Sequence, residues 1–193
     1  MGRGWATRQT GFSLVELLAG VLIAAVILAG LYSAFFSQHE AFSAQEQVAE
    51  LNQNIRAALD LMTREIRLAG YKNSTSIFNG IAAATSNSIR ILADLNQDGD
   101  TVDENEDITY SYRPDTKQIC RNGVHLPVAD NITNLSFLYT LANGSVTANP
   151  GNLNDIRKVR ISLTARTPHP DPSTGAYRTI TLSTDVTPRN LAS

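Results

Sequence analysis

Cysteine is almost absent from this chain of 193 residues, because Cys120 is the only one. A single cysteine excludes a framework of intrachain disulfides. Free cysteine behaves as a small hydrophobe and is among the most buried residue types, so we expect Cys120 to lie in the core or in a strand. The alternative is a disulfide between two chains, if the protein is exported.

Motifs of catalysis are also lacking. The three histidines, His39, His125 and His169, lie far apart and have no metal-ligating partner at a recognisable spacing. The sequence has no glycine-rich phosphate loop and no G-x-S-x-G elbow. We therefore do not expect an enzyme, and we expect the histidines to be surface residues.

An excess of basic residues is lacking too. The chain has 16 lysine and arginine residues against 18 aspartate and glutamate residues, which gives a formal net charge of -2. Proteins that bind nucleic acid usually carry a basic surface, because the phosphate backbone attracts it. We therefore do not expect nucleic acid as a partner.

Proline is absent from Phe12 to Leu68, and Gly20 and Gly30 are the glycines of that stretch. A stretch without helix breakers predicts one continuous helix of about 57 residues, roughly 85 Å long at 1.5 Å per residue. Gly70 follows the stretch at a typical position for a helix stop.

The first half of this helix, residues 12–36, is apolar all round except for Glu16. About 20 apolar residues suffice to cross a bilayer, so we expect a transmembrane segment. A carboxylate in such a segment is unfavourable, and its default interpretation is functional. Arg3 and Arg8 precede the segment, and the positive-inside rule then places them in the cytoplasm and the rest of the chain across the inner membrane.

The second half, residues 37–69, is amphipathic. Its apolar residues recur at spacings of three and four, as one face of a helix requires. We expect that face to pack beneath a globular domain, and a coiled-coil seam of about three heptads is the alternative. The apolar positions are Val48, Leu51, Ile55, Leu59, Met62, Ile66 and Ala69.

Residues 70–193 change to a period of two, which is typical of a half-buried antiparallel sheet. Turn signals separate the apolar runs, with a tight hairpin expected at 121–124 and an exposed hairpin loop at 168–175. A long helix followed by strands predicts an α+β fold, with a globular head packed on residues 37–69. The alternating positions are Ile89, Ile91, Ile108, Tyr110, Tyr112, Leu135, Phe137, Tyr139, Val159, Ile161, Leu163, Ile180 and Leu182.

An acidic segment within the head resembles the start of a calcium loop, D-x-N-x-D-G, in which oxygen ligands fall at alternate positions. The twelfth position holds Asn105 instead of the usual glutamate, and the flanks are typical of strands, which disfavours a true EF-hand. A calcium-binding hairpin loop is one interpretation, and a solvated acidic turn is the other. The candidate calcium ligands are Asp94, Asn96, Asp98, Asp100, Glu104 and Glu106.

The run Gly11-Phe12-Ser13-Leu14-Val15-Glu16 before a long apolar helix resembles the class III signal of type IV prepilins and pseudopilins. The resemblance implies a leader, residues 1–11, that a prepilin peptidase removes after Gly11, and N-methylation of Phe12. It also implies that Glu16 guides assembly by pairing with the Phe12 amine of an adjacent pilin. The alternative for Glu16 is that its carboxylate reaches the membrane surface.

Residues 59–71 resemble the end of the long helix in PilW-type minor pilins, and residues 178–191 resemble the last strand of PilW and of the J-type minor pseudopilins. This resemblance implies a type IV pilin fold and a structural subunit for pilus assembly or priming, with other major and minor pilins as partners. It places the chain in the bacterial inner membrane as a single-pass protein, and then in the filament or at its tip. A J-type minor pseudopilin of a type II secretion system, or an adhesion module at the filament tip, is the alternative.

Overall fold

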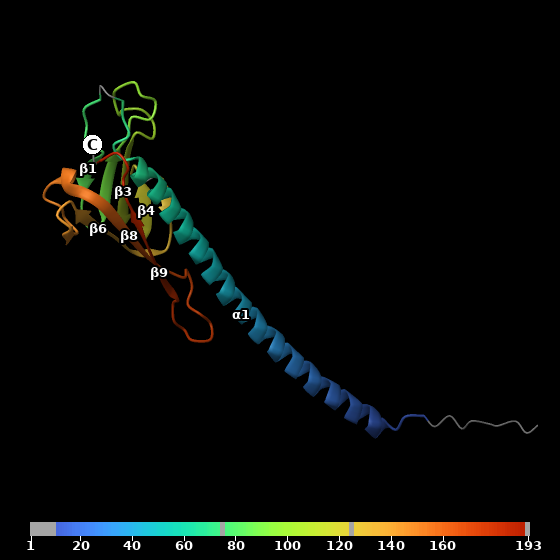
Figure 1. Ribbon diagram of the computed structural model, residues 1–193. Coiled ribbons are helices and arrows are strands. Elements are labelled where there is room, and N and C mark those ends of the chain that lie inside the picture. The colour runs from blue at the N-terminus through green and yellow to red at the C-terminus, as the bar shows by residue number, and fades with distance from the viewer. Residues whose placement is uncertain (1–10, 74–75, 124–125, 192–193) are drawn as a thin grey trace, which may run out of the picture. The chain divides into compact units, whose positions relative to one another are not determined.

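The computed structural model describes residues 11–73, 76–123 and 126–191 (Figure 1). The chain divides into two compact units, residues 1–44 and residues 45–193. The helix α1 (Leu14–Leu68) has 55 residues and contributes to both. The expected uninterrupted helix is confirmed, and it begins two residues after Phe12.

In the first unit, the described residues are those of the N-terminal part of α1 and the three residues before it. The large apolar side chains from Phe12 to Phe36 are between 52% and 88% exposed. This part of the helix is long and apolar enough to cross a membrane, by length and composition, and none of the apolar window is buried within the chain. Its apolar surface therefore suits lipid or other helices.

In the second unit, the C-terminal part of α1 buries one face. The buried positions follow the predicted stripe, although Val48 at its start is only half-buried. They join residues of both sheets in one hydrophobic core, which confirms packing beneath a head rather than a coiled-coil seam. The buried helix residues are Leu51, Ile55, Ala58, Leu59, Met62 and Ile66.

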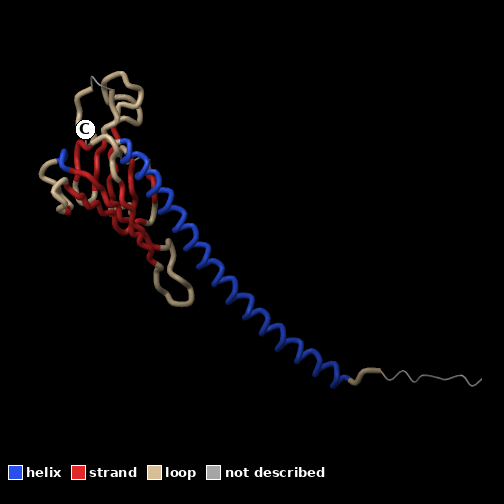
Figure 2. The backbone as a smooth tube through the Cα atoms, viewed as in Figure 1, coloured by secondary structure: helices blue, strands red, loops and turns tan. Residues whose placement is uncertain are grey.

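Five strands form one antiparallel sheet in the order β1-β2-β3-β4-β5 (Figure 2). Each strand pairs with the next along the chain, so the sheet is a simple meander. The strands are β1 (Ile81–Ala84), β2 (Ser88–Leu92), β3 (Asp107–Arg113), β4 (Gln118–Arg121) and β5 (Pro127–Ala129).

A second antiparallel sheet has the order β7-β6-β8-β9. The long strands β6 and β8 form its centre, and alternate residues along both are buried. The elements are β6 (Ile132–Leu141), β7 (Val146–Thr147), the short 3-10 helix η1 (Leu153–Asp155), β8 (Ile156–Arg166) and β9 (Thr179–Val186).

The sequence predicted one antiparallel sheet, whereas the structure has two. Only Asp130 and Asn131 separate β5 from β6, and Asn131 has a left-handed φ of 59°. The two strands therefore do not continue one ladder, and the second sheet packs over the same core. The period of two identifies the buried face of a strand but not its neighbours, because pairing depends on residues distant in sequence.

The hairpin expected at 121–124 is present as the antiparallel pair of β4 and β5. Its connection is longer than a tight turn, since residues 122–126 separate the strands. Asn122 and Gly123 have left-handed φ values of 53° and 109°. Val124 and His125 lie outside the described residues. The loop expected at 168–175 connects β8 and β9, which pair as a hairpin.

Two glycines close the end of α1. Gly70 has a left-handed φ of 80°, as its predicted stop position requires. Its N–H donates to the carbonyl of Leu92, at 2.9 Å, and the N–H of Leu92 donates to the carbonyl of Gly80, also at 2.9 Å. A Cβ built on Gly80 would lie 2.2 Å from the nitrogen of Gly70. The end of the helix, the start of β1 and the end of β2 therefore meet where only glycine fits.

Candidate functional site

The predicted processing segment lies immediately before α1. Gly11 and Phe12 are exposed and have no regular secondary structure. No heavy atom lies within 4 Å of the position of a Cβ built on Gly11. An enzyme could therefore reach the bond between the two residues. The remainder of the predicted leader, with Arg3 and Arg8, lies outside the described residues.

Ser13 and Glu16 cap the start of α1 reciprocally. The N–H of Val15 donates to Ser13 Oγ at 3.3 Å, and the N–H of Ser13 donates to Glu16 Oε2 at 2.9 Å. This is a capping box, S-x-x-E, which satisfies N–H groups that a helix leaves without partners. This capping role of Glu16 was not predicted from the sequence, although the spacing of serine and glutamate is typical of a capping box. Glu16 thus has a partner within its own chain.

The second candidate site is the loop of residues 93–106, which connects β2 and β3. Three Asx turns follow one another in it. The N–H groups of Asp98, Asp100 and Val102 each donate to the side-chain oxygen two residues earlier, at 3.0, 3.1 and 3.0 Å. These turns direct the oxygens of alternate side chains to one side of the loop, as the D-x-N-x-D-G pattern predicts.

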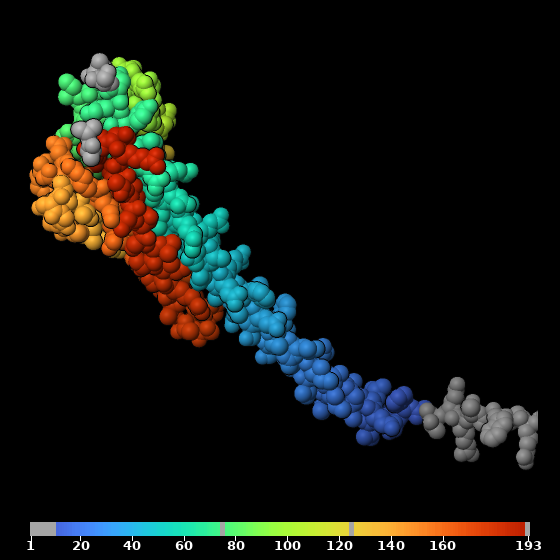
Figure 3. All heavy atoms as spheres, viewed as in Figure 1, coloured from blue at the N-terminus to red at the C-terminus, as the bar shows by residue number. Residues whose placement is uncertain are grey.

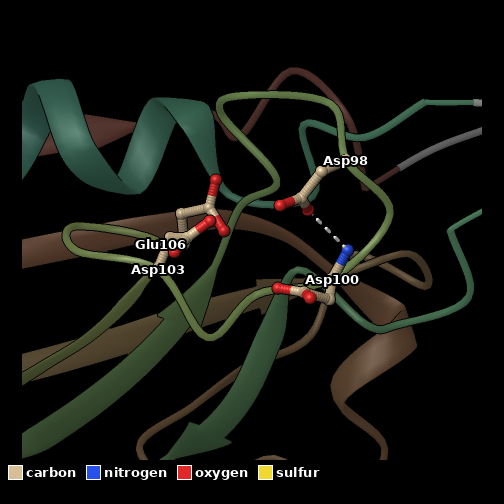
Figure 4. Close-up of side chains that lie close together, drawn as sticks. All are labelled: Asp98, Asp100, Asp103 and Glu106. Carbon is tan, nitrogen blue, oxygen red and sulfur yellow. Dashed lines mark hydrogen bonds between the residues drawn. The ribbon is translucent and has the colours of Figure 1, made fainter.

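Four carboxylates of this loop gather in one place (Figure 4). One oxygen from each lies within 4.8 Å of the others. The group contains three of the six residues predicted as calcium ligands, and it includes Asp103 instead of Glu104, which is exposed. The four residues are Asp98, Asp100, Asp103 and Glu106.

Asn96 and Asp94 have supporting positions in the loop. The Asn96 amide donates to Asp98 Oδ2 at 3.0 Å and to Asp103 Oδ2 at 2.7 Å, and so bridges two carboxylates of the group. Asp94 is fully buried, and its Oδ2 accepts hydrogen bonds from Ser76 Oγ and Gly99 N–H, at 2.8 and 3.2 Å. Both residues therefore hold the loop in shape.

The carboxylates of the group influence each other's ionisation. The hydrogen bonds from the Asp100 N–H and the Asn96 amide lower the pKa of Asp98. The Asn96 amide also favours the charged form of Asp103, but desolvation and the negative charges of Asp98 and Glu106 outweigh it and raise the pKa of Asp103. Like charges so close together oppose each other's ionisation, and a cation between them would remove that opposition.

The loop is attached to the segment that follows α1, and the two lie side by side in Figure 3. The N–H of Asp94 donates to the Tyr71 carbonyl at 2.8 Å, and the Gln97 amide donates to the Tyr71 hydroxyl at 2.6 Å. The Asn73 amide donates to the Gln97 carbonyl at 2.9 Å. The shape of the acidic loop and the course of the chain after the helix are therefore coupled.

The two histidines that the structure describes do not join either site. His39 is exposed on α1, where its ring stacks on Phe35 with the centroids 6.4 Å apart. His169 is exposed, and its backbone N–H donates to Gln47 Oε1 at 3.3 Å. His125 lies outside the described residues. Among the described residues, the acidic group of the β2–β3 loop is the one cluster of metal-ligating side chains, and it contains oxygen ligands only.

Two family models match the sequence. The model described as "Prokaryotic N-terminal methylation motif" matches residues 6–32, which include Gly11, Phe12 and Glu16. The model described as "Prepilin peptidase-dependent protein B" matches residues 44–186, which is more than half of the chain and most of the second unit. No curated protein matches the chain.

Proposed function

The chain belongs to the prepilin peptidase-dependent protein B family and is a type IV pilin or pseudopilin, and on that premise we propose that it is a minor pilin of the PilW type. In this proposal it is a structural subunit for pilus assembly or priming. Both matching families are of structural, pilin-type proteins, so the mechanism that we derive is assembly and not catalysis.

One observation carries the proposal: an apolar helix surface that no described residue covers. From Phe12 to Phe36 every large apolar side chain is more than half exposed. Apolar surface in water is unfavourable by about 25 cal/mol per Å². Lipid can cover this surface in the inner membrane, and the helices of other pilins can cover it in a filament. The same surface then serves both as anchor and as assembly element.

The proposed path begins with processing. A prepilin peptidase cuts after Gly11 and leaves a free amine on Phe12, which is then methylated. Before the cut, Arg3 and Arg8 keep the leader in the cytoplasm by the positive-inside rule, so the second unit lies on the other side of the membrane. The exposed, irregular backbone at Gly11 and Phe12 supports this step, because a peptidase needs an accessible, extended bond.

Glu16 has a defined role in the proposed assembly. Its carboxylate caps the start of its own helix through Oε2, and the negative charge there suits the positive end of the helix dipole. When the helix joins a bundle, the positively charged Phe12 amine of a neighbouring subunit can take the place of, or add to, this cap. A carboxylate is unfavourable in the bilayer unless a partner neutralises it, so the pair favours assembled helices over single ones.

Three variants separate the pairing role from the capping role. Glu16→Gln keeps a capping acceptor, since glutamine also fits a capping box, but removes the charge. Glu16→Ala removes both, and Ser13→Ala removes the Oγ half of the cap and keeps the charge. We expect all three to insert in the membrane. We expect both Glu16 variants to be depleted from purified filaments at least about tenfold, the effect of about 1.4 kcal/mol, and Ser13→Ala to enter them normally.

Normal entry of Glu16→Gln into filaments would show that capping suffices, and would overturn the pairing role.

The choice between a pilus and a secretion pseudopilus needs a second experiment. Deletion of the gene, with complementation by the wild-type chain, is scored for surface pili and for secreted proteins in the same cells. Loss of pili with intact secretion is the expected result. The opposite result would assign the chain to the J-type minor pseudopilins.

A further inference from the structure

The β2–β3 loop contains buried carboxylate oxygens to which no described residue donates a hydrogen bond. Asp94 Oδ1 and Glu106 Oε2 are buried and accept no hydrogen bond from any described residue. Buried acceptors are normally paired, and an unpaired one needs an explanation such as a bound ion. Of the two residues, Glu106 belongs to the group of four carboxylates, whereas Asp94 lies in the same loop but outside that group.

Glu106 links the two observations. It is 2% exposed, and its Oε1 accepts hydrogen bonds from the N–H groups of Leu95 and Asn96, at 2.7 and 3.2 Å. These bonds fix the side chain within the acidic group, to which it contributes an oxygen. Figure 4 shows its carboxylate facing those of the neighbouring aspartates. The other oxygen of this fixed and buried carboxylate, Oε2, accepts no hydrogen bond from any described residue.

We propose that this loop is a Ca2+ site, with Asp98, Asp100, Asp103 and Glu106 as its carboxylate ligands. Calcium binds six to eight oxygens at about 2.3–2.6 Å, so two ligand oxygens can lie up to about 5 Å apart. One oxygen from each of the four carboxylates lies within 4.8 Å of the others, a spacing that fits a single calcium ion among them. The remaining ligands of a calcium ion here would be further oxygens, from water or the backbone.

The chemistry of the donors selects the metal. Zinc, copper and iron favour histidine and cysteine ligands, and none belongs to this group. Magnesium requires a strict octahedron and retains several waters, whereas a loop of consecutive Asx turns with several carboxylates suits the larger, less demanding calcium ion. The glycine after Asp98 has a φ of 105°, and this left-handed conformation makes the sharp turn that the loop needs.

Calcium at this position would fasten the loop to the end of α1. Asp94 joins the loop to Ser76 and to the Tyr71 carbonyl, and Gln97 joins it to the Tyr71 hydroxyl. Bound calcium removes the repulsion among the carboxylates, so these connections become more stable. Three of the four ligands are exposed, which favours an affinity of the class of extracellular calcium modules, about 10⁻⁴–10⁻³ M.

The test uses the full chain, purified in detergent and stripped with EDTA. Calorimetric titration with CaCl2 should give saturable binding of one ion per chain. Thermal unfolding should shift upward by about 5–10 °C at a calcium concentration one hundred times the Kd. The same concentration of MgCl2 should give less than half of that shift. Absence of both heat and thermal shift with 10 mM CaCl2 would overturn the proposal.

A matched pair of variants tests the assignment of the ligands. Asp103→Asn and Glu104→Gln each remove one negative charge from an exposed side chain of the same turn, but only Asp103 belongs to the group. We expect Asp103→Asn to weaken calcium binding about tenfold or more, because affinity follows the number of charged ligands. Glu104→Gln should bind as the wild type does. Equal weakening by both variants would indicate attraction by charge alone and would overturn the site.

A readout without calcium guards against a purely structural effect. In EDTA, Asp103→Asn should unfold at the same temperature as the wild type or higher, because it removes repulsion from the group. A marked decrease would mean that the Asp103 carboxylate stabilises the empty loop by itself, and would contradict the proposal. Binding by the chain does not depend on filament entry, so this test and the test of Glu16 fail independently.

Discussion

Glu65 on α1 and Tyr110 on β3 are joined by a short hydrogen bond, in which the tyrosine hydroxyl donates to Glu65 Oε2. Arg121 on β4 adds an ion pair to the same carboxylate, at 3.1 Å. The side chains of Arg121 and Glu65 are only 15% and 17% exposed. Helix and first sheet are thus held together by charge-assisted hydrogen bonds at the edge of the core.

Tyr110→Phe should therefore destabilise the second unit. Burial and the adjacent Glu65 carboxylate raise the pKa of Tyr110, so its hydroxyl stays protonated and acts as a donor. Its removal leaves Glu65 with one donor fewer, and we expect a loss of about 1–3 kcal/mol in the free energy of unfolding. Urea unfolding measures this as a lower midpoint with an unchanged m value.

Tyr177→Phe is the matched control for that substitution. Tyr177 is 45% exposed, and its ring, which the substitution retains, lies under the Arg166 guanidinium at 4.3 Å. The control should change the free energy of unfolding by no more than about 0.5 kcal/mol. Equal midpoints for Tyr110→Phe and Tyr177→Phe would show that the hydrogen bond to Glu65 contributes nothing to stability.

The close approach of Gly80 and Gly70 supports a second prediction. A Cβ on Gly80 would lie 2.2 Å from Gly70 N and 2.5 Å from Gly70 Cα. Those are backbone atoms at a helix end, so the backbone must move. We expect Gly80→Ala to lower the free energy of unfolding by about 1–3 kcal/mol or more, as overpacking does. Thermal unfolding of the full chain measures it.

Gly151→Ala is the control for Gly80, since a Cβ at that position meets no heavy atom within 4 Å. We expect it to leave stability within about 1 kcal/mol of the wild type, and an increase is consistent with the reduced freedom of the unfolded chain. If the two alanine variants were equally stable, the crowded junction of α1, β1 and β2 would have to be looser than its backbone distances indicate.

Much of the fold was predictable because its signals are local. The absence of proline predicts the uninterrupted α1, and the spacing of Leu51, Ile55 and Met62 predicts the face that α1 buries. Alternation of apolar residues likewise predicts the strands and their inner faces. Each of these patterns repeats within one element, so a short stretch of sequence contains all the information needed.

The remainder depends on residues that are distant in sequence. No local pattern indicates that β5 and β6 belong to different sheets, or that Gly80 must fit against Gly70. In the sequence pattern, Glu65 is an ordinary polar position of the helix. Its partners Tyr110 and Arg121 lie on strands more than forty residues away in the sequence. Tertiary pairing, not propensity, decides these features.

The acidic loop was predicted in part. The sequence indicated its alternating oxygen side chains, but it did not indicate that Asp103, and not Glu104, belongs to the acidic group. Asn105 adopts a left-handed φ of 71°, and the N–H of Glu106 donates to the Asp103 carbonyl at 3.2 Å. This turn brings the side chains of its two ends together and leaves Glu104 at its exposed corner. The turn at Asn105 thus leaves Asp103 in the acidic group and Glu104 outside it.

Cys120 supports a third prediction. The residue lies in β4 and is fully buried, as the sequence predicted for a small apolar residue. We expect its thiol to react with a thiol reagent at least about a hundredfold more slowly in the native chain than in urea, since access requires the strand to open. An added cysteine at the exposed helix position Ala57 provides the matched control, and should react rapidly under native conditions. Rapid native labelling of Cys120 itself would contradict its burial and reopen a disulfide between chains.

The loop expected at 168–175, between β8 and β9, is exposed as predicted except at Asp171, which is buried. Its Oδ1 accepts hydrogen bonds from the Ser173 hydroxyl and N–H, at 2.6 and 2.9 Å. Its Oδ2 accepts two from the Arg178 guanidinium, at 3.0 and 2.7 Å. The Ser173 hydroxyl and the Arg178 guanidinium, together with the Ser173 N–H, lower the pKa of Asp171 to about 2.

This lowered pKa predicts how stability depends on pH. The unfolded chain binds a proton at Asp171 near the ordinary value of 3.8, and the folded chain resists it until about 2. The contribution of Asp171 is therefore fully present above about pH 4 and is lost as the pH falls towards 2. We expect Asp171→Asn to lower the melting temperature at pH 7, and the difference from the wild type to shrink steadily below pH 4.

Asp60→Asn is the control, because Asp60 is exposed on α1 and has no hydrogen bond or ion pair with any described residue. A difference between Asp171→Asn and the wild type that persisted unchanged at pH 2.5 would show that the side chain acts through its shape and not through its charge.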